Sequence, residues 1–362
     1  MCQFHFMLSF PASLVRTTWL AAALFSAVAF GQASWLLSPV GFGPGQQAMS
    51  GAALLSNKGV AALASNPAEV ASLRGLAFYA SGDFALTSLQ RQGAEAKRHV
   101  LARPQLAAAW RLPEGFAAGL GWGRGSLWVE DVAKTQQVPL HRMLANVAWE
   151  WLPGWRLGAA VQLATTESAA WRWGEESWRG GRIAAATRAG LTADVMPKRF
   201  ALALQWEEGL SLSSRKGGFP RLKTPHSLAL ALWLGQSASW EFEADFVYGW
   251  QRTQADAAGN AQVREDTLGV RAGMGLWLTP VIQLRAGGAV FSHKVPSRPS
   301  WLQPMDAWSG SLSAGALWRY GPLRLEMAWQ LLAGFESAKA PASRLKQRVS
   351  NLLSLGVGWS FD

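Results

Sequence analysis

Residues 240–250 read WEFEADFVYGW, and this stretch decides the fold class. Its aromatic and apolar side chains fall mainly on alternate positions, while the acidic Glu241, Glu243 and Asp245 stand between them. The turn of an α-helix would mix these two groups around its surface, whereas a strand places them on opposite faces. The stretch is therefore predicted to be an amphipathic β-strand.

The same alternation recurs along the chain, for example over residues 200–206, 323–331 and 353–361. We count about fourteen such runs of roughly 11–16 residues, whereas an average strand in a soluble protein has ~5–6. Tilted strands of this length cross a membrane as a barrel. The runs cover residues 75–90, 98–112, 116–129, 140–152, 155–169, 182–196, 198–210, 223–235, 238–253, 264–279, 281–293, 307–320, 322–336 and 347–361.

The connections between these runs alternate in length, as in outer-membrane barrels with short periplasmic turns and longer outer loops. The short turns fall at Pro113–Gly115, Pro153–Gly154, Pro197, Gly235–Gln236, Pro280 and Gly321. The long loops cover residues 91–97, 130–139, 170–181, 211–222, 254–263, 294–306 and 337–346. We predict an all-β protein: a transmembrane antiparallel β-barrel of about 14 strands in the outer membrane of a Gram-negative bacterium.

Composition excludes several other classes. Hydrophobic residues make up 49% of the 362 residues and charged residues 16%, which is unlike a disordered chain. Outside one N-terminal stretch there is no run of ~18 apolar residues, so a multi-helix membrane protein is excluded. The 21 Trp against 3 Tyr suit aromatic girdles at the membrane interfaces, and a Trp-rich soluble sandwich is the alternative.

The N-terminus has the features of a secretory signal peptide. Arg16 precedes the apolar residues 19–30, and the small residues Gly31 and Ala33 suit a signal peptidase. We predict a signal peptide over residues 1–33, with a retained anchor as the alternative. The single cysteine, Cys2, lies within it, so the mature chain would lack disulfides, thiolate metal sites and a Cys nucleophile.

Residues 34–74 do not alternate and are predicted to form a plug, or hatch, ahead of a barrel over residues 75–362. They contain GFGPG at residues 41–45, AMSGA at 48–52 and VAALASNPAE at 60–69. This segment resembles the N-terminal signature of the FadL-type transporters and the related PorV/PorQ group. The resemblance implies a fourteen-stranded outer-membrane barrel with an N-terminal plug. It singles out the plug motif residues Gly51, Asn66, Pro67 and Ala68.

The NPAE sequence also has a purely structural interpretation. Asn66 is suited to an N-cap, Pro67 to the first helical position and Glu69 to a capping box. A short helix over residues 67–73 would then lead into the first strand. The resembling proteins usually carry Gly where this chain has Glu69, which argues against a simple transfer of a gating role.

Alternation also predicts charged residues inside the barrel. They are Arg188, Arg271, Arg285, Arg324, Glu241, Glu243, Asp245 and Glu326. In a narrow barrel such charges form cross-strand pairs and bind the plug, or they line a polar conduit. An aliphatic ligand would instead need an apolar pocket at the outer mouth, for which the candidate lining residues are Phe84, Leu86, Phe116, Leu120 and Trp122.

No catalytic or cofactor motif is present, so we predict neither an enzyme nor a cofactor. His99, His141, His226 and His293 fall near the outer ends of different strands and lack spaced carboxylate partners, so we predict no metal site. The net charge of +11 favours nucleic acid at first sight. In a barrel, however, the basic loops would face outer-membrane lipid, including lipopolysaccharide phosphates, and we predict no nucleic-acid partner.

Two functions remain open. The first is a PorV/PorQ-like docking component of a type IX-like protein secretion and surface-attachment system, with secretion-system proteins as partners. The short chain and degenerate plug motif favour this function slightly. The alternative is a FadL-like passive transporter of small hydrophobic molecules such as long-chain fatty acids. It would capture its ligand at the outer mouth and release it after a shift of the plug around residues 66–68.

Overall fold

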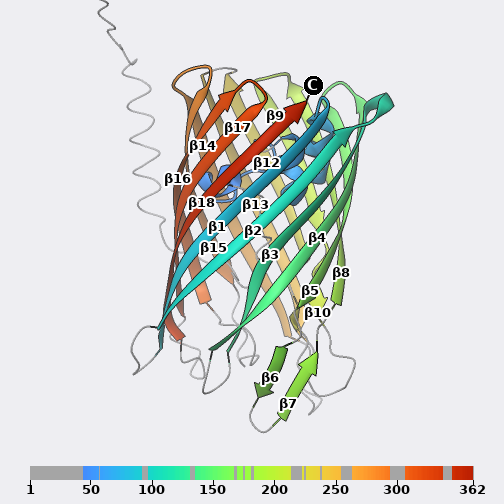
Figure 1. Ribbon diagram of the computed structural model, residues 1–362. Coiled ribbons are helices and arrows are strands. Elements are labelled where there is room, and N and C mark those ends of the chain that lie inside the picture. The colour runs from blue at the N-terminus through green and yellow to red at the C-terminus, as the bar shows by residue number, and fades with distance from the viewer. Residues whose placement is uncertain are drawn as a thin grey trace, which may run out of the picture.

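Fourteen strands close into one antiparallel barrel in the computed structural model (Figure 1). The structure describes residues 44–56, 58–91, 97–130, 135–166, 169–173, 176–180, 183–212, 222–223, 226–236, 239–253, 263–293, 306–336 and 345–361. The barrel strands are β1 Leu76–Arg91, β2 Lys97–Arg111, β3 Phe116–Glu130, β4 Thr135–Leu152, β5 Trp155–Thr166, β8 Ile183–Met196, β9 Phe200–Glu207, β12 His226–Gln236, β13 Trp240–Thr253, β14 Val263–Trp277, β15 Ile282–His293, β16 Asp306–Tyr320, β17 Leu323–Glu336 and β18 Leu345–Phe361. The predicted fold class is confirmed.

The barrel closes because the first strand pairs with the last. Leu76 lies opposite Phe361 and the ladder continues to Gln90 opposite Gln347, while β1 pairs with β2 on its other side. With an even number of strands, the chain enters and leaves the barrel at the same end. That end carries the C-terminus and the short turns, so it is the periplasmic end (Figure 1).

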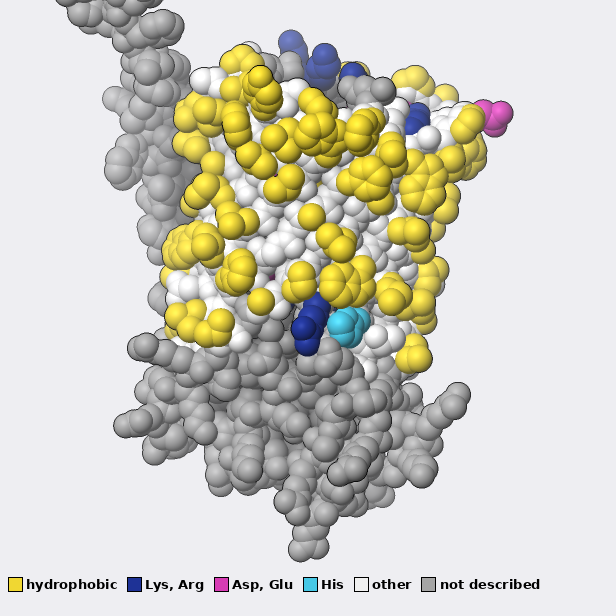
Figure 2. All heavy atoms as spheres, in the orientation of Figure 1, with side chains coloured by type: hydrophobic (Ala, Val, Ile, Leu, Met, Phe, Trp, Pro, Cys, Tyr) yellow, Lys and Arg dark blue, Asp and Glu magenta, His cyan; other side chains and the backbone are white. Residues whose placement is uncertain are grey.

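The two faces of each strand have opposite chemistry. On β18, Leu353, Leu355 and Val357 are each about half exposed, whereas the intervening Ser354 and Gly356 are buried. Figure 2 shows hydrophobic side chains spread over the outer wall with few charges among them. Aromatic residues, including Trp318, Tyr320 and Trp359, are exposed toward the periplasmic strand ends. This apolar exterior on a closed barrel places the chain in an outer membrane.

Two of the predicted loops contain short hairpins. At the predicted loop 170–181, β6 Ala169–Trp173 pairs with β7 Glu176–Gly180, and at the predicted loop 211–222, β10 Ser211–Leu212 pairs with β11 Leu222–Lys223; each hairpin extends one residue beyond its predicted loop. The β6–β7 hairpin projects from the end opposite the C-terminus (Figure 1). Hairpins outside the membrane need no lipid-facing apolar stripe, so barrel periodicity does not reveal them.

Two other predicted boundaries are also wrong. β4 already begins at Thr135, inside the predicted loop 130–139, and Gly235 and Gln236 belong to β12 rather than to a turn. Residues 135–139 read TQQVP, so the strand continues past the point where apolar alternation marks it. Alternation therefore finds the lipid-facing part of a strand better than its ends.

Three short helices lie inside the barrel, in the half nearer the periplasmic end (Figure 1). They are α2 Pro44–Ala48 and the 3-10 helices η1 Gly59–Ala64 and η2 Pro67–Ser72. Nearly all of their residues are buried. We call residues 44–73 the plug.

A third 3-10 turn, η3 Pro113–Gly115, lies outside the plug and joins β2 to β3. No helix in the described ranges is long and apolar enough to cross a membrane.

Two predictions fall outside the described residues. The signal peptide over residues 1–33 is one of them. The other is the contact of the basic loops with outer-membrane lipid, since loop residues such as Arg215, Lys216 and Arg221 lie outside the described ranges. Both remain predictions.

The apolar outer belt can be tested with an introduced charge. Leu230, half exposed near the middle of β12, faces the centre of the bilayer, and Tyr320 lies at the end of β16. We expect Leu230→Arg to cost about 2–4 kcal/mol of folding stability and Tyr320→Arg about 0–1 kcal/mol, because the desolvation cost of Arg grows with depth. Urea titration of folding into lipid vesicles measures both. Equal costs at the two sites would contradict the assigned belt.

Candidate functional site

Asn66 is fully buried and anchors the plug. Its side-chain oxygen accepts a hydrogen bond from the Ala68 backbone at 3.1 Å, so the predicted N-cap is confirmed. Its amide nitrogen donates to the Leu54 carbonyl at 3.0 Å and to the Thr192 hydroxyl of β8 at 3.1 Å. One side chain therefore starts η2, holds the preceding loop and joins both to the barrel wall.

The predicted capping box is wrong, because Glu69 turns toward the wall. Its carboxylate lies 2.7 Å from Arg156 of β5, and that guanidinium also binds Asp194 at 2.5 Å. Burial raises the pKa of the Glu69 carboxyl, and the Arg156 charge acts in the opposite direction. Glu69 is thus a tether between plug and barrel rather than a local helix cap.

Two acidic residues of β13 hold the loop between α2 and η1. The Glu243 carboxylate accepts hydrogen bonds from the backbone N–H groups of Leu55 and Ser56, both at 2.8 Å. Asp245 accepts one from Ala53 at 3.3 Å. Hydrogen bonds to a carboxylate are stronger than neutral ones, so this strand grips the irregular plug backbone.

Arginines of the wall also bind the plug, by donating hydrogen bonds to its backbone carbonyls. Arg188 donates to Ala64 O at 2.6 Å and pairs with Glu207 at 2.9 Å. Arg271 donates to Gly51 O at 3.2 Å. Gly51 has a φ of +88°, a conformation that glycine adopts without the penalty of a side chain.

The remaining lumen charges form a separate cluster on the wall. Arg285 lies 3.3 Å from Glu241 and 4.0 Å from Glu326, and Arg324 also pairs with Glu326. Tyr79 of β1 donates to Glu326 at 2.5 Å. The structure therefore places all eight charged residues named from the sequence on the inner face, in two roles: plug binding and wall pairing.

Sequence reasoning missed the glycines that let the plug approach the wall. A Cβ atom added at Gly158 would overlap the backbone of Pro67, and one at Gly190 would overlap the Asn66 side chain. A Cβ at Gly287 would meet the backbone of Met49. The available signal was glycine at inward positions of separate strands, which marks close backbone approach.

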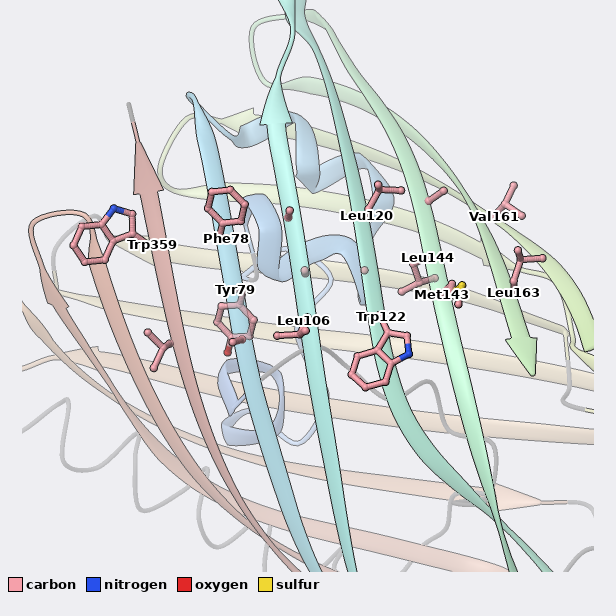
Figure 3. A pocket seen from close by; sticks show the side chains of 16 residues that line it. Phe78, Tyr79, Leu106, Leu120, Trp122, Met143, Leu144, Val161, Leu163 and Trp359 are labelled. Carbon is pink, nitrogen blue, oxygen red and sulfur yellow. The ribbon is translucent and has the colours of Figure 1, made fainter. Parts of the chain in front are cut away.

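The barrel ladder is interrupted between β2 and β3. Their pairing runs from Arg111 opposite Ala117 to Gln105 opposite Gly123 and then stops. Among the described residues, no pairing joins residues 97–104 of β2 to residues 124–130 of β3, although both strands stay paired to their other neighbours. We call these two unpaired stretches the fork, which opens toward the long-loop end (Figure 3).

The local sequence explains where the fork begins. Pro104 stands at the first missing rung and has no backbone N–H to donate. β3 carries glycine at positions 119, 121, 123 and 125, so its inner face lacks side chains that could pack against β2. A proline within a predicted strand was the signal that sequence reasoning passed over.

An apolar groove of about 750 Å³ lies on the outer wall beside the paired end of the fork. Leu106, Leu120, Trp122 and Met143 line it, and the small Ala80, Ala108, Gly121 and Ala145 also take part (Figure 3). Leu120 is 55% exposed, and Phe84, Leu86 and Phe116 are also exposed on the outer wall. The prediction that these residues line a pocket at the outer mouth is therefore wrong, because they lie on the outer wall, where Leu120 and Trp122 line the groove.

The two histidines whose side chains the structure describes do not converge. His141 stacks on Trp122 and His226 on Trp250, on different parts of the barrel. Nothing is described for the side chains of His99 and His293. In the described part of the chain, no three His, Cys, Asp or Glu residues are placed to hold a metal ion.

Solved structures with a similar fold include a FadL homologue and two toluene transporters. A FadL homologue of Pseudomonas aeruginosa has 12% sequence identity and a TM-score of 0.69, covering 88% of this chain and 98% of its own. The toluene transporter TodX of Pseudomonas putida has 15% identity and a TM-score of 0.61, covering 87% and 97%. The toluene transporter TbuX of Ralstonia pickettii has 14% identity and a TM-score of 0.62, covering 90% and 100%. No protein-family model and no curated protein sequence matches the chain.

The glycine contact at the plug can be tested by adding a side chain. We expect Gly190→Val to displace η2, because the new methyl groups overlap Asn66. A Ser65→Cys reporter, buried in the parent and placed in a Cys2→Ser background, should then react with maleimide. Gly82→Ala is the matched control, since its nearest neighbour atom lies 4.0 Å away. Equal labelling in both variants would contradict the contact.

The buried pair between Glu69 and Arg156 can be tested by a double-variant comparison. Arg156→Met should weaken the plug by about 3–5 kcal/mol, because it leaves a buried carboxylate without its cation. Adding Glu69→Gln should recover much of that loss, since only the part-exposed Asp194 carboxylate then lacks its cation. Hydrogen exchange of the η2 amides measures both. If the double variant is as unstable as the single one, the pair does not hold the plug.

Proposed function

We propose that the chain is a passive outer-membrane channel for small hydrophobic molecules, which pass sideways between lumen and lipid at the fork. The observation that carries this proposal is the missing ladder between β2 and β3 beside an apolar outer groove. Backbone groups inside a membrane are normally all paired, so an unpaired wall segment calls for a functional reason.

The contacts of the plug argue against an axial route. Arg156, Glu243, Asp245 and Arg188 of the wall each bind it through charged groups, at separations of 2.6–3.3 Å. Each such hydrogen bond contributes about 1.5–3 kcal/mol, so moving the plug would break several at once. The plug motif around Asn66 then acts as a fixed floor that turns cargo toward the wall, rather than as the moving gate considered from the sequence.

The groove supplies the apolar side of the route. Its volume of about 750 Å³ falls within the ~300–1,000 Å³ range of small-molecule sites. It is continuous with the lipid-facing wall, so a hydrophobic molecule leaving the fork meets apolar side chains and then lipid. No energy source is required, because the molecule moves down its own concentration gradient.

The two functions considered from the sequence are not equally supported. The structural neighbours named above are described as toluene transporters and a FadL homologue, which favours the transporter over the secretion docking component. At 12–15% identity this support is an analogy of fold. The fork and groove belong to this chain and carry the proposal.

Locking the fork should stop passage. Continuing the register places Arg103 opposite Gly125. We expect Arg103→Cys with Gly125→Cys, joined by a bifunctional maleimide in a Cys2→Ser background, to reduce toluene uptake severalfold in cells that produce the protein. The same cross-link at Ser227→Cys with Gly249→Cys, a rung already paired between β12 and β13, should leave uptake unchanged.

The outcomes separate the two functions. Uptake that survives the cross-link at the fork would exclude the lateral route. No uptake above background in the parent protein would exclude the channel, and the docking component would become the leading alternative.

A further inference from the structure

Nearly every arginine of the inner wall has a carboxylate nearby. Ion pairs within 4.0 Å join Arg103 to Asp83, Arg111 to Glu150, Arg156 to Glu69 and Asp194, Arg188 to Glu207, Arg285 to Glu241 and Glu326, and Arg324 to Glu326. Arg271 lies opposite Asp245 in the ladder and binds the carbonyl of Gly51. Such pairing is expected, because an isolated buried charge is costly.

Among the buried arginines that the structure describes, Arg142 of β4 is the exception, whereas Arg319, which also lacks an ion pair, is exposed and lies over the Trp277 ring. It is 8% exposed, and none of the ion pairs within 4.0 Å includes it. Its partner is the neutral Gln162 of β5, whose amide oxygen, when turned toward it, accepts from Nη2 at 2.7 Å and from Nε at 3.3 Å. Nearby Glu207 is already bound to Arg188. Arg142 therefore carries a positive charge that no adjacent side chain neutralises.

Arg142 stands at the paired end of the fork. In the ladder it lies directly opposite Gly123, and Gly123 lies opposite Gln105 on the last paired rung of β2 and β3. Gly123 has no side chain to cover the guanidinium. The uncompensated cation is thus placed where the lumen meets the interrupted part of the wall.

The residues next to this rung form the outer groove. Along each strand, successive side chains point to opposite faces. Gln105, Arg142 and Gln162 are buried on the inner face, and their neighbours Leu106, Met143 and Leu163 line the groove outside. One polar site inside and one apolar site outside are therefore separated by the thickness of a single strand layer.

We propose that Arg142, positioned by Gln162, binds the anionic oxygen head group of an amphiphile whose apolar chain lies in the outer groove. A carboxylate or a phosphate suits the planar donors of a guanidinium. This inference rests on the proposed lateral channel. It adds that the site prefers anionic ligands, a preference that a channel for neutral hydrocarbons would not need. The head group belongs to a carboxylate cargo or to a membrane phospholipid.

Paired probes of equal chain length test this site. Binding of dodecanoate and of dodecanol is measured by calorimetry on the full chain in phosphatidylcholine nanodiscs. We expect Arg142→Gln to weaken dodecanoate about tenfold or more, the usual effect of losing a charged hydrogen bond, and to change dodecanol less than about twofold. Arg142→Lys should retain most of the dodecanoate affinity, because it keeps the charge.

Controls separate charge from folding. Arg199→Gln removes one charge from an exposed turn and should leave both affinities unchanged. The heat-dependent gel mobility of the folded barrel shows whether Arg142→Gln still folds, and Arg142→Lys provides the conservative comparison.

A lipid exchange identifies the source of the head group. If replacing phosphatidylcholine by phosphatidylglycerol weakens dodecanoate binding in the parent but not in Arg142→Gln, the lipid head group occupies the site. No such competition assigns the site to the cargo.

The contrary outcomes are distinct. Equal losses for dodecanoate and dodecanol, or unchanged dodecanoate binding in Arg142→Gln, would overturn the anion site and leave the lateral channel standing. If neither probe binds the parent protein, the channel itself is overturned, and the anion site with it.

Discussion

The structure depends on one constraint: a backbone N–H or C=O group in lipid must find its partner within the protein. A sheet with a free edge cannot meet that requirement, so the first and last strands pair and the barrel closes. Because the first and last strands pair antiparallel, the strand count is even and the chain returns to the end at which it entered. The fork between β2 and β3 is the departure from this rule, and it begins where Pro104 cannot donate a hydrogen bond.

The same requirement explains why the inner face is charged. The plug consists of short helices and loops, whose backbone groups are not all paired among themselves. Carboxylates of β13 accept its N–H groups, and arginines of other strands donate to its carbonyls. Most of the lumen charges are therefore accounted for by plug binding and by pairing on the wall. Arg142 stands out because neither account includes it.

Several parts of the candidate site were predictable, and the reasons are local. The inward facing of Glu243 and Asp245 follows from alternation along one strand, and the Asn66 cap follows from its own short segment. The partners of these residues were not predictable, because Glu69 binds a wall arginine rather than its own helix. The outward facing of Leu120 and Trp122 was misjudged, because glycines rather than charged residues alternate with them on β3.

The sequence by itself determined the strands, their number and the opposite chemistry of their faces, because alternation with period two is a property of neighbouring residues. It also marked the non-alternating segment that becomes the plug. Only the tertiary structure decided which glycines receive the plug, which charges remain unpaired and where the ladder ends. Those features depend on register and on contacts between residues far apart in the chain, as between Asn66 and Gly190, and no local pattern records such distances.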